Sequence, residues 1–374
     1  MLLYRTDTDK NRIDVSPVLC DSYPGGSCWI IGAGPSLLNL SDQDIERIQN
    51  SPAAKFAVNH GGRRKDGSWI IKPTHWTSYD PTDKFSQALY NDPSIVKFVS
   101  GTRSMDVVPD DTRKLCDAPN MYFITKEDRP YSRMFDRNAK AVLDCRDSFI
   151  QAIDIAFRLG FRRLYCIGTE LKINPSPEQR AYIESFGLTF EDDLLKRRDG
   201  YLTDRLSEMV EEVRIKAGMP SKGQATAKLF EDKGREDQYC FGDRKAFAAA
   251  VSCDGHYWER VQFLRLGRRC MELNGLELYS CTPKSRLNSV FKYLPVWQAV
   301  AEIQGRTGSY QEDLERAYTD RMIPYLALHR DVPAFSWPKE AKVVEVRKDR
   351  IPVDEETKVK IQELLANKEV KLDD

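Results

Sequence analysis

Short apolar runs alternate with amphipathic segments along the first half of the chain. Residues 28–31 and 55–58 are two such runs, and residues 41–49 between them carry Ile45 and Ile48 at helical spacing. A short apolar run is typical of a strand that is buried on both faces of a parallel sheet, and apolar residues three apart are typical of a helix that covers such a sheet. This stretch is therefore predicted to form a strand–helix–strand unit.

The same pattern continues further along the chain. Further strands are predicted around 74–78, 95–99 and 122–125. The clearest helix is 147–159, with an apolar face made of Phe149, Ile150, Ile153, Ala156 and Phe157. Gly160 ends this helix, and the apolar strand 162–168 follows at once. Because the turn between them is short, the helix packs beside its own strand, as in a parallel α/β sheet.

Composition divides the chain into parts. Residues 1–26 are polar and end in a Pro-Gly-Gly loop that leads into the first strand. Residues 27–295 are predicted to form one Rossmann-like α/β domain, a mostly parallel sheet with helices on both faces. Within it, residues 172–250 are charged and interrupted by proline, which indicates a lid-like insertion. Residues 296–374 are predicted to be a helical C-terminal extension.

Charge and cysteine content narrow the class of protein. Lys and Arg together number 57, as do Asp and Glu, so no net field attracts nucleic acid or an anionic membrane. No apolar run approaches the ~18 residues of a membrane span, and the N-terminus lacks the apolar core of a secretion signal. The nine cysteines form no C-x-x-C pair, which indicates reduced thiols rather than metal ligands. We therefore expect a cytoplasmic protein without a membrane span.

The first predicted strand ends in the turn 32–36, Gly-Ala-Gly-Pro-Ser, and a helix start follows at 41–44. A strand, a glycine turn and a helix N-terminus in succession present backbone N–H groups to a phosphate. A dinucleotide-binding domain needs a third glycine and an acidic end to its second strand, where this chain has Leu37 and Asn59. A dinucleotide oxidoreductase and a methyltransferase are therefore minor alternatives, and the Walker pattern of P-loop kinases is absent.

Four segments taken in order carry a more specific signal. They are Gly-Ala-Gly-Pro-Ser-Leu at 32–37, Phe-Ala-Val-Asn at 56–59, the helix and strand at 148–170, and 253–287, which begins Cys-Asp-Gly-His. In this order and spacing the chain resembles the bacterial family-42 sialyltransferases. It also resembles their wider relatives, the central domain of the motility-associated factor (Maf) flagellin glycosyltransferases and the MptE-like pterin pyrophosphokinases. The resemblance covers about 27–60, 145–171 and 250–295 of the chain.

The resemblance implies a site for a nucleotide-sugar donor. In these families the glycine turn lies against the donor nucleotide, and its counterparts here are Gly32, Ala33, Gly34, Pro35 and Ser36. The Asn that ends the second strand contacts the donor and matches Asn59, and the Ser that opens the long helix contacts the sugar and matches Ser148. Sialyltransferases have Asn where this chain has Ala33, which favours the wider family. The leaving-group tyrosines of the family fall in the insertion, where Tyr182 and Tyr201 are candidates.

The resemblance also implies a histidine base, and His256 matches it. A histidine with an ordinary pKa near ~6.5 can accept the proton of an acceptor hydroxyl at neutral pH. Asp254, in the same predicted loop, either orients this histidine or merely forms the turn. The alternative is that His256 caps a helix and has no chemical role.

Other polar residues near predicted strand ends are candidates for lining the cleft, because ligands bind at that edge of parallel sheets. They are His60, His75, Tyr79, Asp80, Glu170 and Ser285. Under the pyrophosphokinase alternative, Asp80 and Glu170 would help to hold Mg²⁺.

The favoured function is therefore a sialyltransferase-like glycosyltransferase that requires no cofactor and uses a nucleotide-sugar as its donor substrate. It would transfer the sugar to a hydroxyl of a glycan, a protein or another acceptor, with His256 as the base. A nucleic-acid acceptor is not favoured, and oligomerisation is left open. Two alternatives stay open as well: an MptE-like pyrophosphokinase that needs ATP and Mg²⁺, and a non-catalytic nucleotide-binding protein.

Overall fold

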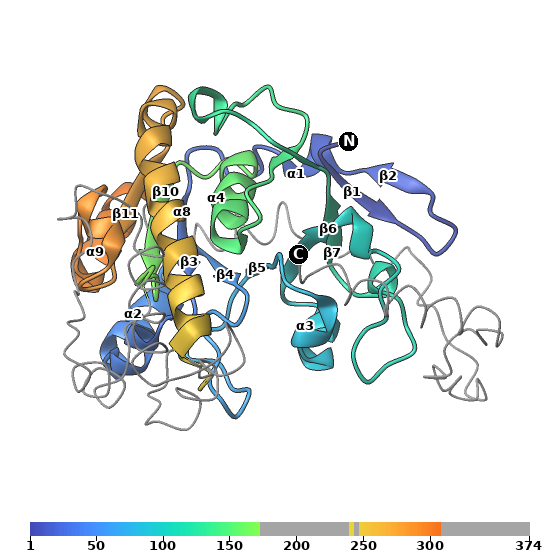
Figure 1. Cartoon of the computed structure of the whole chain (residues 1–374), viewed down its shortest axis with the longest axis horizontal. Helices are drawn as coiled ribbons and strands as arrows, with labels where there is room; N and C mark the ends of the chain where they lie inside the picture. The colour runs from blue at the N-terminus through green and yellow to red at the C-terminus, as the bar shows by residue number, and fades with distance from the viewer. Residues whose placement is uncertain (173–238, 243–246, 308–374) are drawn as a thin grey trace, which may run out of the picture. The chain divides into compact units, whose positions relative to one another are not determined.

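The computed structural model describes residues 1–172, 239–242 and 247–307. These residues contain a nine-stranded sheet of order β11-β10-β3-β4-β5-β6-β7-β1-β2 (Figure 1). Its strands are β1 Leu3–Thr6, β2 Arg12–Asp14, β3 Ser27–Ile31, β4 Ala54–Val58, β5 His75–Thr77, β6 Val96–Ser100, β7 Met121–Ile124, β10 Arg163–Ile167 and β11 Glu277–Ser280. A separate two-stranded sheet pairs β8, Lys126–Glu127, with β9, Val142–Leu143.

All neighbouring strands from β11 to β7 are parallel, which confirms the prediction of a mostly parallel α/β sheet. From β3 the chain adds β4, β5, β6 and β7 in one direction, and later adds β10 and β11 on the other side of β3. The strand order therefore reverses between β3 and β10. In open parallel sheets, ligands bind beyond the carboxyl ends of the strands at such a reversal.

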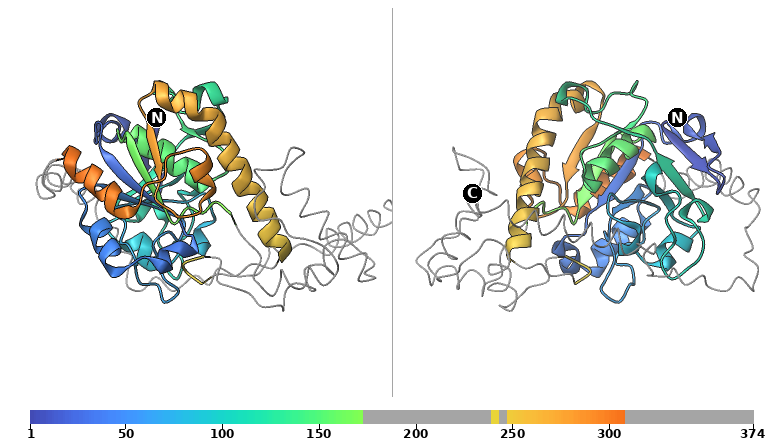
Figure 2. Two further views of the ribbon diagram at one scale, coloured as in Figure 1. Left: turned by 90° about the vertical axis from the view of Figure 1, so that its left-hand side faces the viewer. Right: turned by 45° about the vertical axis from the view of Figure 1, so that its right-hand side comes forward.

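Helices cover both faces of the sheet (Figure 2). They are α1 Ser16–Leu19, α2 Asp42–Asn50, α3 Gln87–Asn91, α4 Ser148–Arg158, α8 Phe247–Leu273 and α9 Val296–Thr307. Short 3-10 helices lie at Pro35–Asn39, Thr82–Lys84, Gly101–Arg103, Leu115–Asp117, Tyr131–Arg133 and Arg286–Ser289. In this part of the chain, no helix combines the length and apolar character that a membrane crossing requires.

The central strand β3 shows why the apolar runs are continuous. Successive side chains of a strand point to opposite faces of the sheet. Cys28 and Ile30 pack in the core that includes α4 and α8, whereas Trp29 and Ile31 pack in the core that includes α2 and α9. All four side chains are fully buried. A strand covered on both faces needs apolar residues at every position, which is the pattern observed.

Helices α2 and α4 both begin at side-chain caps. Ser41 Oγ accepts a hydrogen bond from the Asp44 N–H at 3.1 Å at the start of α2. Asp147 Oδ1 accepts one from the Ile150 N–H at 2.8 Å at the start of α4. Such caps satisfy N–H groups that have no partner inside the helix and stabilise it by about 1 kcal/mol each.

The N-terminal segment 1–26, which is polar and for which no strand was predicted, contributes two strands to the sheet. β1 runs antiparallel to β7, with Leu3 opposite Ile124, and β2 pairs with β1 at the edge. These strands were missed because the apolar stretch 2–4 is too short to stand out as a strand in the sequence. Its side chains are nevertheless buried, so this segment belongs to the same sheet as the predicted domain.

The helix expected to begin near residue 257 begins at Phe247. Residues 253–256 therefore lie in α8 rather than in a loop, and Gly255, which is unfavourable inside helices, obscured this in the sequence. The first helix of the extension 296–374, α9, packs in the core beside α2. The lid residues 173–238 and 243–246, with Tyr182 and Tyr201, and the remaining extension 308–374 lie outside the described residues.

Candidate functional site

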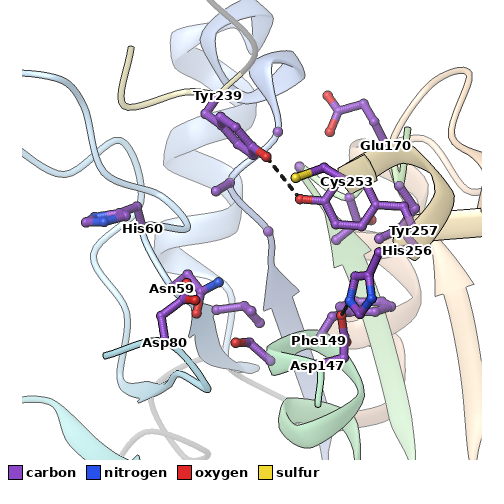
Figure 3. A pocket seen from close by; sticks show the side chains of 18 of the residues that line it. Asn59, His60, Asp80, Asp147, Phe149, Glu170, Tyr239, Cys253, His256 and Tyr257 are labelled. Carbon is purple, nitrogen blue, oxygen red and sulfur yellow. Dashed lines mark hydrogen bonds and ion pairs between the residues drawn. The ribbon is translucent and has the colours of Figure 1, made fainter. Parts of the chain in front are cut away.

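A cavity of about 740 Å³ lies beyond the carboxyl ends of β3, β4, β5 and β10, where the strand order reverses (Figure 3). This volume is in the range of small-ligand sites. One wall, the turn wall, comprises residues 32–35 after β3 and 168–172 after β10. A second wall, the helix wall, comprises residues 146–149 at the start of α4 together with Cys253, His256 and Tyr257 of α8. The lining is completed by residues 58–60, Tyr79, Asp80, Lys84, Tyr239 and Phe241.

The glycines of the turn wall allow two strand ends to approach each other. The Gly32 N–H donates to the Ile167 carbonyl and the Gly34 N–H to the Gly168 carbonyl, each at 2.8 Å. A Cβ at Gly32 would lie 2.2 Å from the Gly168 oxygen, so only glycine fits there. Gly168 has a φ of +64° and packs against Leu37. The close approach that a dinucleotide-binding domain obtains from its third glycine is therefore supplied here by Gly168.

The carboxylate of Glu170 fills the open side of the glycine turn. Its Oε1 accepts a hydrogen bond from the Ser36 N–H at 2.7 Å. Its Oε2 is buried and has no hydrogen-bond partner within the described part of the chain. A Cβ at Gly34 would lie 1.5 Å from this Oε2, so the carboxylate touches the turn backbone. The N–H groups of Gly32, Gly34 and Ser36 are thus all engaged inside the protein, and the prediction that they are bare is wrong.

Asn59 and Ser148 both reach the cavity, and each is held by a hydrogen bond near the end of β5. Asn59 ends β4 with a φ of +54°, a conformation that Asn tolerates better than most residues. Its Oδ1 accepts from the Ser78 hydroxyl at 2.7 Å, and its amide nitrogen is directed toward the cavity (Figure 3). Ser148 Oγ accepts from the Tyr79 N–H at 2.8 Å. Both side chains are therefore fixed before any ligand binds.

His256 faces the cavity from α8 and is paired with a carboxylate of α4 (Figure 3). Its Nε2 lies 2.9 Å from Asp147 Oδ2, and its side chain is 35% exposed. The other oxygen of Asp147 caps α4, so the carboxylate is held in place. If Nε2–H donates to Asp147, the lone pair of the neutral ring is on Nδ1. Within the described ranges, Nδ1 has no hydrogen-bond partner, so this atom is free to accept a proton.

Two predicted site residues serve the scaffold instead. The buried Asp254 carboxylate accepts a hydrogen bond from Arg286 at 2.7 Å. Residues two apart on a helix do not face each other, so Asp254 points away from the histidine that it was expected to orient, and Asp147 occupies that position. Ser285 was expected to line the cleft, but its hydroxyl donates to the Thr169 carbonyl at 2.6 Å and it lies outside the cavity lining. Both residues anchor the loop after β10.

The other two histidines of the described chain have packing roles. His60 lines the cavity, but its ring packs between Phe85 and Phe241, with centroid distances of 4.8 and 4.4 Å. His75, expected near the cleft, is buried in the core beside Phe161, and burial lowers its pKa to about 3. It opens β5, so it lies at the opposite end of that strand from the cavity. His256 therefore remains the best placed base.

Tyr79 and Asp80 line the cavity after β5 and are held by basic side chains. The Lys126 ammonium lies 3.7 Å from the centroid of the Tyr79 ring, and burial lowers the pKa of this lysine to about 8. Asp80 forms an ion pair with Lys84 at 3.4 Å. The Arg103 guanidinium donates to the carbonyls of both Tyr79 and Asp80. The backbone of this loop is thus held by Arg103, and its carboxylate is already paired with a lysine.

Apart from His256, several lining residues carried no recognisable signal in the sequence. Cys253, His256 and Tyr257 lie three and four residues apart, and this spacing places them on one face of α8. The spacing is visible in the sequence only if the helix is extended through its glycine. Tyr257 Oη lies 3.3 Å from Tyr239 Oη, a contact between segments that no local pattern connects. Asp147 resembles an ordinary helix cap, and its second role follows from the packing of α8 on α4.

The two carboxylates that were candidates for holding Mg²⁺ do not lie together. Asp80 and Glu170 are on opposite sides of the cavity (Figure 3). No group of three or more His, Cys, Asp or Glu side chains converges within the residues that the structure describes. The carboxylates present thus do not fit a shared site for the ion.

No protein-family model matches the chain, and no curated protein matches it in sequence. Among solved structures, the Maf glycosyltransferase from Magnetospirillum magneticum AMB-1 is similar to it with a TM-score of 0.37 and 15% sequence identity. The similarity covers 84% of this chain and 41% of that protein, so the chain spans less than half of the bacterial enzyme. The assignment of the site rests on the contacts described above.

Proposed function

We propose that the protein is a glycosyltransferase that uses a nucleotide-sugar as donor, with His256 as the base. The observation that carries this proposal is the His256–Asp147 pair on the wall of a cavity at the reversal of the strand order. A histidine that is fixed by a buried carboxylate and exposed on its other side has the geometry of a general base.

In the proposed step, the hydroxyl oxygen of the acceptor attacks the anomeric carbon of the donor. The bond between that carbon and the phosphate oxygen breaks, and the departing nucleotide takes its electron pair. His256 Nδ1 takes the proton of the attacking hydroxyl, and the Asp147 carboxylate stabilises the imidazolium that forms. Atoms and charges balance without a redox partner.

Two further observations support a sugar-nucleotide substrate, and a third bears on the acceptor. The cavity of about 740 Å³ accommodates a ligand of that size. Asn59 and Ser148, the two residues that the family resemblance assigns to the donor, both line it and are oriented before binding. Acceptors with a hydroxyl, such as glycans or proteins, are favoured over nucleic acid because the chain has no net positive charge. A pyrophosphokinase is less well supported, because Asp80 and Glu170 lie apart.

The test begins with a thermal-shift screen of CMP, UDP, GDP and ATP, because a ligand at 100 times its Kd stabilises a protein by about 2.7 kcal/mol. Sugar conjugates of the preferred nucleotide are then assayed for nucleotide release and sugar transfer. His256→Ala is expected to keep the thermal shift and lose transfer. Glu259→Gln, an exposed change nearby on α8, is the matched control and should transfer at the parental rate. Parental turnover in His256→Ala would contradict the role of the base.

A further inference from the structure

The charged groups that line the cavity are unevenly distributed. Among the lining residues that the structure describes, the cations are Lys84, Arg146 and Lys172, and the carboxylates are Asp80, Asp147 and Glu170. Lys84 is neutralised by Asp80. Asp147 is bound to His256 on the helix wall, and Glu170 is bound to the Ser36 N–H on the turn wall. The position of an incoming phosphate therefore depends on the two remaining cations, Arg146 and Lys172, and on the Glu170 charge.

The turn wall repels an anion in this structure. A phosphate at the glycine turn would have to replace the Glu170 carboxylate at the Ser36 N–H, or lie in contact with it. The carboxylate also touches Gly34, so no space is left between it and the turn backbone. Two like charges ~4 Å apart repel strongly when they are partly shielded from water. Lys172 follows Glu170 by two residues and lies on the same wall.

Arg146 differs from the two lysines of the cavity in position and in the contacts of its side chain. It is exposed, its φ is +50°, and its guanidinium has no hydrogen-bond or ion-pair partner within the described ranges. A left-handed conformation is unfavourable for an arginine and is held here by the loop that enters α4. The residue directly precedes Asp147 and Ser148, so its side chain belongs to the wall that carries the base. A guanidinium binds two phosphate oxygens at once, which an ammonium does not.

From this distribution we infer that the cavity binds the phosphate of its substrate at Arg146 on the helix wall, and that Glu170 excludes phosphate from the glycine turn. The inference rests on the proposed function, because it takes the substrate to be a phosphate-linked donor. It reverses the orientation that a glycine turn suggests: the leaving phosphate lies on the same side as His256, and the turn wall is left for uncharged parts of the donor.

Binding of inorganic pyrophosphate and of the preferred nucleotide tests the inference without any turnover. We compare Arg146→Gln, Lys172→Gln and Glu170→Gln in the full chain by calorimetric titration. Arg146→Gln is expected to weaken both ligands roughly 10- to 100-fold, the range for a lost hydrogen bond to a charged group. Lys172→Gln should change binding by less than about threefold. Glu170→Gln removes the charge that excludes phosphate from the turn, so it should tighten rather than weaken binding. The matching nucleoside, which has no phosphate, should bind all variants equally.

Three results would overturn the inference. They are a tenfold tightening in Glu170→Gln with no loss in Arg146→Gln, a loss confined to Lys172→Gln, and no binding of either anion to the unaltered protein at millimolar concentration. A failure here is distinguishable from a failure of the proposed function. Transfer that depends on His256 while Arg146→Gln binds normally would leave the function standing and refute only the phosphate position.

Discussion

The two walls of the cavity satisfy their polar groups in different ways. On the turn wall, backbone N–H groups and the Glu170 carboxylate bind one another, so conspicuous glycines serve to bring β3 and β10 together. On the helix wall, His256 and Arg146 are exposed to the cavity, and a buried carboxylate, Asp147, fixes the histidine. The wall with the recognisable motif is thus largely structural, and the wall with ordinary residues carries the groups that can react.

The difference teaches that a phosphate-type turn is not by itself a phosphate site. Its N–H groups bind whichever acceptor the rest of the chain places beside them, and here the chain supplies its own carboxylate, Glu170. Residues 239–242 join the two walls: the Cys240 N–H donates to the Ala33 carbonyl at 2.9 Å, and Tyr239 reaches Tyr257 on α8. The walls can therefore be perturbed separately or through this connection.

The largest effect is expected from Asp147→Asn on the helix wall. Asn caps a helix as well as Asp, so α4 should stay intact and the melting temperature should change little. The Asn amide would favour the tautomer of His256 that has no lone pair on Nδ1, and transfer should fall on the order of 10³-fold. Steady-state kinetics and thermal melting of the same preparation measure both quantities. Parental kinetics would contradict the assignment of this carboxylate.

Asp254→Asn is the matched control and should behave in the opposite way. The Asp254 carboxylate is buried against Arg286, so its neutralisation leaves a buried cation poorly compensated. We expect a loss of about 3 kcal/mol in the free energy of unfolding, a value typical of a broken buried pair. At a temperature where the variant is folded, its transfer rate should be close to parental.

On the turn wall, Gly32→Ala and Gly34→Ala should differ in stability. An added Cβ at Gly32 would lie 2.2 Å from the backbone oxygen of Gly168, and this oxygen cannot move without displacing β10. We therefore expect the free energy of unfolding to fall by on the order of 3 kcal/mol. The Cβ at Gly34 meets the end of the flexible Glu170 side chain, and a loss of about 1 kcal/mol is expected. Urea denaturation measures both.

A double variant sharpens the result for the turn. In a Glu170→Ala background, Gly34→Ala should cost almost nothing, because the atom that its Cβ meets has been removed. Gly32→Ala should cost the same in either background. Equal costs of the two glycine substitutions in both backgrounds would contradict the assignment of Glu170 to the open side of the turn.

The dependence of stability on pH tests the burial of His75 in the core. Burial lowers the folded-state pKa of His75 to about 3 from the usual 6.5. The unfolded chain therefore binds a proton below pH 6.5 that the folded protein does not, and stability is lost as the pH falls from 6.5 toward 3. At pH 5 the loss is about 2 kcal/mol relative to pH 7. His75→Phe should remove this part of the slope in urea denaturation; parallel slopes would refute it.

The smallest loss of stability is expected from a change at Tyr239, which connects the two walls. Tyr239→Phe removes the hydroxyl that lies 3.3 Å from the Tyr257 hydroxyl. A single hydrogen bond of this kind contributes about 1 kcal/mol, so the free energy of unfolding should fall by that amount or less. Urea denaturation detects the change, with the exposed Tyr131→Phe as a control. A loss above about 3 kcal/mol would show that residues 239–242 do more than connect the walls.

The fold was largely predictable because most of the strands follow local rules. Strands such as β3 and β4 are buried on both faces, and the caps of α2 and α4 are ordinary Ser and Asp. β1 was missed because only three apolar residues mark it, and its pairing partner β7 is distant in sequence. α8 was shortened because Gly255 interrupts a helical pattern. Such features depend on tertiary contacts that outweigh local propensity.

The site was predictable only in part. Asn59, Ser148 and His256 all reach the cavity; Asn59 follows a strand and Ser148 opens a helix that the sequence indicates. The partner of the histidine was misassigned, because proximity along the chain favoured Asp254 over Asp147. The pairing of His256 with Asp147 forms only when α8 packs against the start of α4. No local pattern in the sequence indicates that these two segments are in contact.

The antiparallel edge at β1 has a consequence for the order of assembly. Residues 3–6 leave the ribosome well before their partner at 121–124 is made, so β1 can pair only with β2 while β3 to β6 are being synthesised. The parallel strands can dock one after another as they emerge, whereas this edge is closed late and over a long loop, which is slow. Until then β7 has a free edge of the kind that pairs with other chains. Nascent chains that stall before β1 docks are therefore the form of this protein most exposed to aggregation.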